Sequence, residues 1–327
     1  MGGAVLCSVV IPTYRRSALL RECLAALCRQ TLGTSRYEII VVDDGLELAT
    51  KREVEAWQRS PSSPPLFYLT SPGPRRGPAA ARNIGWKAAT GSIIAFTDDD
   101  CRPRPDWLAA GTSLFSDPEI SGAWGRIVVP LPEDPTDYER NTAGLEEAPC
   151  ATANCFYRRS ALIAVGGFDE RFTAAWREDS DLQFSFLEKG YRLTPVSEAV
   201  VEHPVRPASW GVSIRQQRNN LFNALLFKKH PILYRRFIQA SPPWDYYINV
   251  AALLGTAAGS AVEWSLLSAT AFLVWILGVG RFCSRRLRHT SRRRAHIAEM
   301  LLTSALIPPV AVYWRLKGAV KYRVAFL

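Results

Sequence analysis

The sequence has few features of a secreted or zinc-stabilised protein. Its seven cysteines are odd in number and scattered, and none shows the paired spacing of a zinc site. The nearest pair, Cys150 and Cys155, has no second pair at a suitable distance. No basic stretch leads into an apolar segment at the N-terminus, so no signal peptide is expected. We therefore expect reduced, buried thiols in a cytosolic protein.

Acidic residues are too few to balance the basic ones. The chain has 40 Lys and Arg against 30 Asp and Glu, a net charge of +10, which favours an anionic partner such as nucleic acid, a phospholipid surface or a phosphorylated ligand. Seven arginines crowd one segment beside the most apolar part of the chain: Arg281, Arg285, Arg286, Arg288, Arg292, Arg293 and Arg294. That adjacency favours a membrane surface over nucleic acid.

Short apolar runs alternate with helical patterns through most of the chain, whose 327 residues suffice for one large or two modest domains. Strands are expected at 5–11, 37–42, 66–69 and 92–97, with helices in the intervals between them. Further strands are expected at 154–157 and 200–204. This alternation predicts an α/β fold with a mostly parallel sheet.

Two of the expected strands end in carboxylates. The run before Asp98-Asp99-Asp100 is buried in character, and the second strand ends in Asp43-Asp44. The carboxyl ends of strands are where open α/β sheets bind ligands, and adjacent carboxylates need a counter-cation. Oxygen ligands suit Mg²⁺ or Mn²⁺, which commonly bridge to phosphates. The alternative interpretation is a solvated acidic turn.

Three later residues have both a structural and a functional interpretation. Glu178 and Asp179 open an expected helix, where acidic side chains often only complement the helix dipole. His203 ends a strand, and a single histidine is commonly structural. Neutral imidazole is nevertheless an acceptable Mn²⁺ ligand, so His203 is a candidate for the metal site.

The C-terminal region is apolar. Residues 248–279 are interrupted only by Glu263, and two geometries fit: one long tilted span, or a re-entrant hairpin bent near Glu263. Residues 300–314 are apolar again, but Pro308-Pro309 is expected to break any straight helix. Basic and aromatic residues border both runs, which favours a membrane over a soluble second domain and places the arginines on the cytoplasmic side. We predict a catalytic domain over 1–235 and a membrane-associated helical region over 236–327.

An ordered set of motifs resembles one family. The set comprises Val9-Val10-Ile11-Pro12-Thr13-Tyr14, Ile40-Val41-Val42-Asp43-Asp44-Gly45, Ala81-Arg82-Asn83-x-Gly85, Phe96-x-Asp98-Asp99-Asp100, Gly166-Gly167-Phe168-Asp169-Glu170 and Glu178-Asp179-x-Asp181-Leu182. It covers roughly residues 5–235 and resembles the family 2 inverting glycosyltransferases. The resemblance implies a GT-A type nucleotide-diphospho-sugar transferase fold, followed here by C-terminal apolar helices.

The resemblance also implies roles for individual residues. The nucleotide-sugar pocket would include Pro12, Thr13, Tyr14, Asp43, Arg82, Asp98 and Asp99, with Asp43 accepting a hydrogen bond from the base. Asp100, together with Asp98 and His203, would hold a divalent cation, Mn²⁺ or Mg²⁺. Asp179, with Glu178 beside it, would supply the catalytic base. The Gln-x-x-Arg-Trp motif of processive members is absent, since the nearest stretch, residues 215–220, lacks the tryptophan. That absence favours transfer of a single sugar.

The expected function is thus transfer of one sugar, most typically from a UDP-linked donor, to a lipid-linked or glycan acceptor at the cell membrane, as in making cell-envelope polysaccharide. The catalytic domain would face the cytoplasm, and no nucleic acid is expected as a partner. The sequence leaves the sugar, the base, the acceptor and the oligomeric state open.

Three rival functions fit less well. A nucleotidyltransferase that forms sugar nucleotides would need a glycine-rich loop with a lysine after the first strand, where residues 12–16 have no glycine. A phosphatase with an Asp43 nucleophile would need Asp-x-Asp, where the chain has Asp43-Asp44-Gly45. A non-catalytic membrane-bound sugar-nucleotide sensor would not need Asp100 and Asp179 intact.

Overall fold

The computed structural model describes residues 5–73 and 76–326. The sequence predicts a flexible basic loop at Gly73–Pro78 that opens the next helix, and its residues Pro74 and Arg75 lie outside the described residues. The chain divides into two compact units. Unit 1 comprises residues up to Pro130 together with Ala143–Val205, and unit 2 comprises Leu131–Thr142 and Arg206–Leu327. The division predicted at 235/236, into a catalytic domain and a membrane-associated helical region, stays a prediction.

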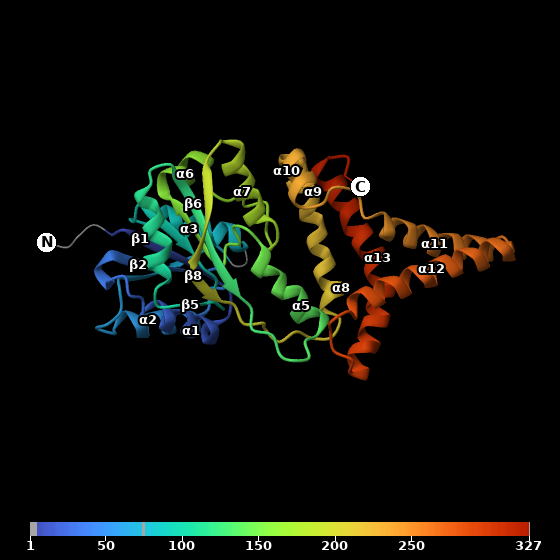
Figure 1. The fold of residues 1–327 in the computed structure, drawn as a ribbon, viewed down its shortest axis with the longest axis horizontal. Coiled ribbons are helices and arrows are strands. Elements are labelled where there is room, and N and C mark those ends of the chain that lie inside the picture. The colour runs from blue at the N-terminus through green and yellow to red at the C-terminus, as the bar shows by residue number, and fades with distance from the viewer. Residues whose placement is uncertain (1–4, 74–75, 327) are drawn as a thin grey trace. The chain divides into compact units, whose positions relative to one another are not determined.

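Unit 1 is built on a mixed, mostly parallel sheet with the strand order β3-β2-β1-β4-β7-β6-β8-β5 (Figure 1). The strands are β1 (Cys7–Thr13), β2 (Tyr37–Asp43), β3 (Leu66–Thr70), β4 (Ile93–Phe96), β5 (Arg102–Pro103), β6 (Ile120–Val128), β7 (Cys155–Arg158) and β8 (Arg192–Glu202). Strands β3, β2, β1 and β4 are parallel to one another, which confirms the α/β prediction. Strands β7 and β5 pair antiparallel, an arrangement the local pattern did not indicate.

Helices cover both faces of this sheet. They are α1 (Ser17–Leu27), α2 (Leu48–Gln58), α3 (Pro78–Ala88), α4 (Trp107–Ser113), α6 (Arg159–Val165) and α7 (Glu178–Glu188), with short 3₁₀ turns at Thr34–Arg36, Leu114–Ser116 and Gly144–Glu147. Side chains from α3, α6 and α7 share one buried core with Val10, Ile40 and Phe96 of the strands. Gly85 lets α3 approach β1, because a Cβ there would lie 2.3 Å from Val10 Cγ1.

Unit 2 is helical. It contains most of α5 (Asp137–Ala143), α8 (Val212–Gln216), the 3₁₀ turn Gln217–Asn219, α9 (Asn220–Lys229), α10 (Pro231–Phe237), α11 (Trp244–Ala261), α12 (Ser265–Arg286) and α13 (Arg294–Tyr322). Helix α13 packs along α9, α11 and α12. Two helices, α12 and α13, are long and apolar enough to cross a membrane by length and composition.

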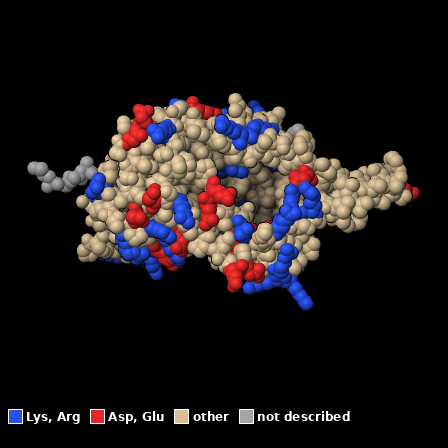
Figure 2. Space-filling model, viewed as in Figure 1, with Lys and Arg blue, Asp and Glu red and all other residues tan. Residues whose placement is uncertain are grey.

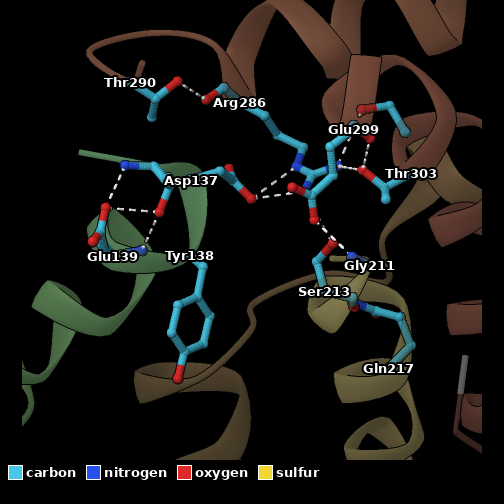
Figure 3. Close-up of polar contacts among 12 residues, drawn as sticks. Asp137, Tyr138, Glu139, Gly211, Ser213, Gln217, Arg286, Thr290, Glu299 and Thr303 are labelled. Atoms are coloured by element: carbon cyan, nitrogen blue, oxygen red, sulfur yellow. Dashed lines mark hydrogen bonds and ion pairs between the residues drawn. The ribbon is translucent and has the colours of Figure 1, made fainter. Parts of the chain in front are cut away.

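A half-buried arginine, Arg286, holds the segment 131–142 against the C-terminal helices (Figure 3). Arg286 Nη2 donates to Asp137 Oδ2 at 2.6 Å, and Arg286 Nη1 donates to Thr303 Oγ1 at 2.6 Å. Nearby, the Gly211 N–H donates to Glu299 Oε1 at 2.7 Å. The sequence predicts a polar, active-site-type loop over about 130–149, but its residues 131–142 belong to unit 2 and its residues 143–149 to unit 1.

One expectation for the C-terminal region is wrong, and one of the two geometries left open for residues 248–279 is excluded. Pro308 and Pro309 do not break α13, which runs unbroken through them. Packing of α13 on three neighbouring helices, with Pro308 buried, outweighs the roughly 3 kcal/mol that a proline costs in a helix interior. The single tilted span over 248–279 is excluded, because the chain reverses at Val262–Trp264, where Glu263 has φ 56.

Candidate active site

The aspartate triplet lies at the carboxyl end of β4, beside the end of β1. Thr13 Oγ1 on β1 donates to Asp99 Oδ2 at 2.8 Å, and Arg16 Nη1 donates to Asp99 Oδ1 at 3.1 Å. Burial raises the pKa of Asp99 to about 6, although Arg16 opposes the shift. The structure thus brings Thr13 and Asp99 together, and Asp99 fixes the triplet to the neighbouring strand.

Arg82 links the triplet to the start of α7. It is 2% exposed, and its Nη2 donates to Asp98 Oδ1 at 2.7 Å while its Nη1 donates to Glu178 Oε1 at 3.0 Å. Burial opposes ionisation of Asp98, but the Arg82 charge and then that of His203 outweigh it, so the pKa of Asp98 is lowered. The link between three sequence motifs was not predicted, because spacing along the chain says nothing about which carboxylates one arginine reaches.

Glu178 and Asp179 have different environments although they are adjacent. Glu178 is 3% exposed, and its Oε2 has no hydrogen-bond partner among the described residues. Burial first, and then the Asp179 charge, raise the pKa of Glu178 to about 7. Asp179 is half-buried, and its Oδ1 accepts the Ser180 N–H at 2.6 Å. Of the two carboxylates, Asp179 is therefore the more accessible to solvent.

Asp100 and His203 meet although they are far apart in sequence. His203 Nε2 lies 3.7 Å from Asp100 Oδ1, and both residues are buried. The backbone N–H of His203 donates to Val128 O at 2.8 Å, which ties the residue after β8 to the end of β6. The structure thus brings His203 close to the triplet, while their sharing a metal site stays a prediction.

This pair fits a divalent cation. One ligand atom each from Asp100, Cys101 and His203 lie within 4.8 Å of one another. The Nδ1 of His203 is buried and has no hydrogen-bond partner among the described residues. Burial raises the pKa of Cys101 well above its ordinary value, so its neutral thiol is a poor ligand for a hard cation. Asp98, the other predicted ligand, has Oδ1 occupied by Arg82.

The end of β2 is held by hydrogen bonds of its own turn. Asp43 is fully buried and accepts hydrogen bonds from the backbone N–H groups of Gly45 (2.7 Å) and Glu47 (2.8 Å) and from Tyr68 Oη (2.8 Å). A carboxylate has about four acceptor positions, so one acceptor position remains beyond these three. Pro12 and Tyr14 lie half-buried at the end of β1, on the adjacent strand.

Asp44 has a role that the motifs did not indicate. Its Oδ1 accepts the Arg76 N–H at 2.9 Å and its Oδ2 accepts the Gly77 N–H at 2.8 Å. These bonds hold the entry to α3, the helix that carries Arg82. The consecutive acids after β2 therefore act within the fold, one on its own turn and the other on the next helix.

Solved structures with a similar fold carry nucleotides. A mannosyltransferase from Pyrobaculum calidifontis, PcManGT, in complex with GDP-Man and Mn²⁺, superposes with a TM-score of 0.61 over 96% of this chain and 88% of that chain, at 20% identity. Residues 1–349 of S. aureus TarS, in complex with UDP, give a TM-score of 0.51 over 96% of this chain and 92% of that chain, at 16% identity. At these identities the likeness shows the GT-A fold alone.

Sequence comparison goes further. Glycosyltransferase AglE of Haloferax volcanii is 31% identical over 211 residues, which are 61% of this chain and 67% of that protein. The pre-mycofactocin glycosyltransferase of Mycobacterium tuberculosis is 33% identical over 215 residues, 61% of this chain and 43% of that protein. The model of glycosyl transferase family 2 matches residues 8–169, and that of glycosyl transferase family group 2 matches residues 93–316. These matches include the carboxylates at the strand ends, Arg82, which links Asp98 to Glu178, and the helix that begins at Glu178. The chain therefore belongs to glycosyltransferase family 2.

Proposed function

We propose that the protein is an inverting glycosyltransferase. It moves one sugar from a nucleoside-diphosphate donor, with UDP as the expected nucleotide, to a lipid-linked or other membrane-borne acceptor, and it requires a divalent cation. The observation that carries this proposal is the convergence of the triplet, Arg82 and the start of α7 at one end of the sheet. Transfer of sugar from a nucleotide-sugar donor follows from the family; the acceptor, the inversion and the metal are the proposed parts.

The donor would lie against the carboxyl ends of β1, β2 and β4. Asp100 and His203 would hold the cation, which supplies positive charge to the diphosphate as it departs. Pro12 and Tyr14 would border the nucleotide, and Asp43 would accept a hydrogen bond from its base. Arg82, already paired with Asp98 at 2.7 Å, would keep that carboxylate ionised on the ribose side. Thr13 and Arg16 hold Asp99 and hence the turn.

The acceptor would be activated by Asp179. Its carboxylate takes the proton of the acceptor hydroxyl as the acceptor oxygen bonds to the anomeric carbon. The bond from that carbon to the diphosphate oxygen breaks on the opposite face, so the configuration inverts. Glu178 is buried beside Asp179 and bonded to Arg82, which supports a role in positioning the base.

We further propose that the acceptor is membrane-borne and that unit 1 faces the cytoplasm. The support is the apolar, largely exposed helix α12 together with the arginines of residues 281–294, which the positive-inside rule assigns to the cytoplasm. The acceptor would then reach the enzyme at the cytoplasmic leaflet.

Ligand-dependent thermal stabilisation tests the donor site. The detergent-purified chain would be melted with UDP, GDP or dTDP, each with and without Mn²⁺. A ligand present at a hundred times its Kd stabilises the folded state by roughly 3 kcal/mol. We expect a Mn²⁺-dependent increase in Tm with one nucleotide, lost in Asp100→Ala and kept in Asp106→Ala, an exposed aspartate nearby. No increase with any nucleotide would contradict the proposal.

Turnover separates an enzyme from a non-catalytic sensor. The same protein, given nucleotide sugars and a membrane lipid extract, should release nucleoside diphosphate. Asp179→Asn should abolish this release while keeping the Mn²⁺-dependent stabilisation, because the base contacts the acceptor and not the nucleotide. Loss of nucleotide binding in Asp179→Asn would refute the assignment of the base.

A further inference from the structure

The most apolar surface of unit 2 belongs to the hairpin of α11 and α12. The two helices lie side by side and project from the other helices of unit 2 (Figure 1). Their large side chains face outward: Leu254 is 65% exposed, Leu266 69%, Leu273 57% and Leu277 63%. In the apolar 18-residue stretch of α12 only 6% of the residues are buried, whereas 44% are buried in the corresponding stretch of α13. Water-soluble helix pairs place such side chains in their interface, and this pair does the opposite.

Small residues fill the interface of the hairpin instead. A Cβ added to Gly255 would lie 3.3 Å from Ala271 Cβ, and one added to Gly259 would lie 2.7 Å from Ser268 N. A Cβ added to Gly278 would lie 2.5 Å from Asn249 Nδ2. Gly255 and Gly259 form a Gly-x-x-x-Gly pattern. Close backbone approach through small residues, with large apolar side chains outside, is how helices pack within membranes.

Four hydroxyl groups of the hairpin bond within it, whereas Tyr247 Oη and Trp275 Nε1 have no hydrogen-bond partner among the described residues. Thr256, Ser260 and Thr270 each donate to a backbone carbonyl of their own helix, at 2.8–3.0 Å. Ser268 Oγ donates to Thr256 O on the partner helix at 3.1 Å. A segment in hydrocarbon must satisfy its polar groups internally, because no water is available there. The hairpin meets that requirement at these four positions.

Charge is confined to the two ends of the hairpin. Between Asp245 and Arg281 the sequence has only one charged residue, Glu263, at the turn beside Trp264. On the face shown in Figure 2 the hairpin carries no basic side chain along its length and has an acidic one at its end. At 1.5 Å per residue, residues 265–280 extend about 24 Å, somewhat less than the roughly 30 Å hydrocarbon core of a bilayer.

Helix α13 passes the same length test but is built differently. Its Arg315 is 3% exposed and donates to Gln239 Oε1 at 3.1 Å. A Cβ on Gly318 would lie 2.7 Å from Leu221 O of α9, so this face of α13 is committed to unit 2. Helix α13 is a framework helix against which α9 and the base of the hairpin pack.

We propose that the α11–α12 hairpin inserts into a lipid bilayer as a re-entrant pair. Both ends stay at one face, Glu263 and Trp264 approach the headgroups of the other leaflet, and α13 stays out of the hydrocarbon. The occupant is lipid and not a second copy of the chain, because exposed arginines at the base complement anionic headgroups: Arg281, Arg288, Arg292 and Arg294. The proposal goes beyond sugar transfer and does not depend on which reaction unit 1 performs.

Spin labels at introduced cysteines test the depth of each helix. The full chain would be reconstituted in vesicles of three parts phosphatidylcholine to one part phosphatidylglycerol, as Leu254→Cys, Leu273→Cys, Leu302→Cys and the unit 1 control Leu48→Cys. All four leucines are exposed, whereas the native cysteines are buried or half-buried, and the wild-type chain provides the background. The ratio of collisions with oxygen to collisions with a water-soluble nickel chelate reports depth.

We expect this ratio to be several-fold larger at positions 254 and 273 than at position 48, with position 302 resembling position 48. Equal ratios at all four positions would refute insertion. A ratio at 302 as large as that at 273 would overturn the distinction between the hairpin and α13. Protection of 254 and 273 from both reagents, with a doubled mass in detergent, would assign the surface to a second copy. Nucleotide stabilisation, measured on the same samples, reports separately on unit 1.

A matched pair of glycine substitutions tests the packing of the hairpin. Gly259→Leu would push Ser268 away, because the added Cβ meets its backbone nitrogen at 2.7 Å. Gly280→Leu meets nothing within 4 Å. We expect Gly259→Leu to reduce flotation with vesicles severalfold and Gly280→Leu to leave it unchanged, both with normal nucleotide stabilisation. Unchanged flotation of Gly259→Leu would contradict a closely packed inserted pair.

Discussion

Removing the charge of Arg82 tests how the site is held together. Its guanidinium, 2% exposed, pairs with Asp98 at 2.7 Å and with Glu178 at 3.0 Å. Arg82→Met keeps most of the apolar stem and deletes both pairs. Glu178 would then be a buried carboxyl with no basic partner, while Asp98 would lose its nearest cation.

The expected cost is about 3–5 kcal/mol of the free energy of unfolding, the range for breaking a buried ion pair from one side. The cost depends on pH. The pKa of Glu178 is raised from 4.5 to about 7 by burial even with Arg82 present, so loss of Arg82 raises it further. A group with a raised folded pKa stabilises the fold below its unfolded pKa and loses that contribution as pH rises through the folded value. Arg82→Met should therefore cost more at pH 8 than at pH 6.

Urea unfolding of the detergent-solubilised chain, followed by tryptophan fluorescence at both pH values, measures this cost. Lys87→Met, an exposed residue on the same helix, is the control and should change stability by less than about 0.5 kcal/mol. Adding Glu178→Gln to Arg82→Met should recover part of the loss at pH 8, because it removes the unpaired charge. A cost of less than about 1 kcal/mol, equal at pH 6 and pH 8, would refute the interpretation of Arg82 as a buried bridge.

Three further predictions concern unit 1. Glu178→Gln alone should become more stable relative to wild type as pH rises from about 4.5 to 7, because only the wild-type carboxyl must ionise in a buried site. The gain should reach about 3 kcal/mol. A difference in Tm between the two proteins that does not change with pH would contradict this. Gly91→Ala should cost about 1–3 kcal/mol, because its Cβ would meet Ser8 N at 2.8 Å; in urea unfolding the open position Gly33→Ala should cost nothing, and equal effects would rule out the steric cause. Asp44→Ala should cost about 1–3 kcal/mol by leaving the Arg76 and Gly77 N–H groups without their acceptor; unchanged hydrogen exchange at the start of α3 would refute it.

The alternating pattern in the sequence was sufficient for the parallel half of the fold. Strands β1, β2 and β4 were recognisable because each is a short apolar run closed by a proline or by carboxylates. Strand β7 was placed in sequence, but its antiparallel position between β4 and β6 depends on long-range pairing, which local periodicity does not encode. The same limit applies to α13, where tertiary packing tolerates Pro308 and Pro309.

For the candidate site, too, the sequence predicted which residues come together but not all of the contacts they make. The motifs placed Asp100 and His203 in one site, and the two side chains do approach to 3.7 Å. They did not indicate that Arg82 joins Asp98 to Glu178, or that Asp43 is largely occupied by its own turn. Such contacts depend on side-chain direction at the ends of separate elements, and this direction is set only when the sheet and helices pack.

The segment 131–142 has a consequence for how this enzyme can be divided. It leaves the chain of unit 1 after Pro130, packs within unit 2 through Asp137 and Arg286, and returns at Ala143. Unit 2 is therefore discontinuous, and a stop codon near residue 206 would remove the partners of a segment that remains in the chain. A transplanted or exchanged C-terminal region would have to match this segment as well as the helices. In related proteins we therefore expect the two units to occur together, and a substitution at Asp137 to be accompanied by a substitution at Arg286.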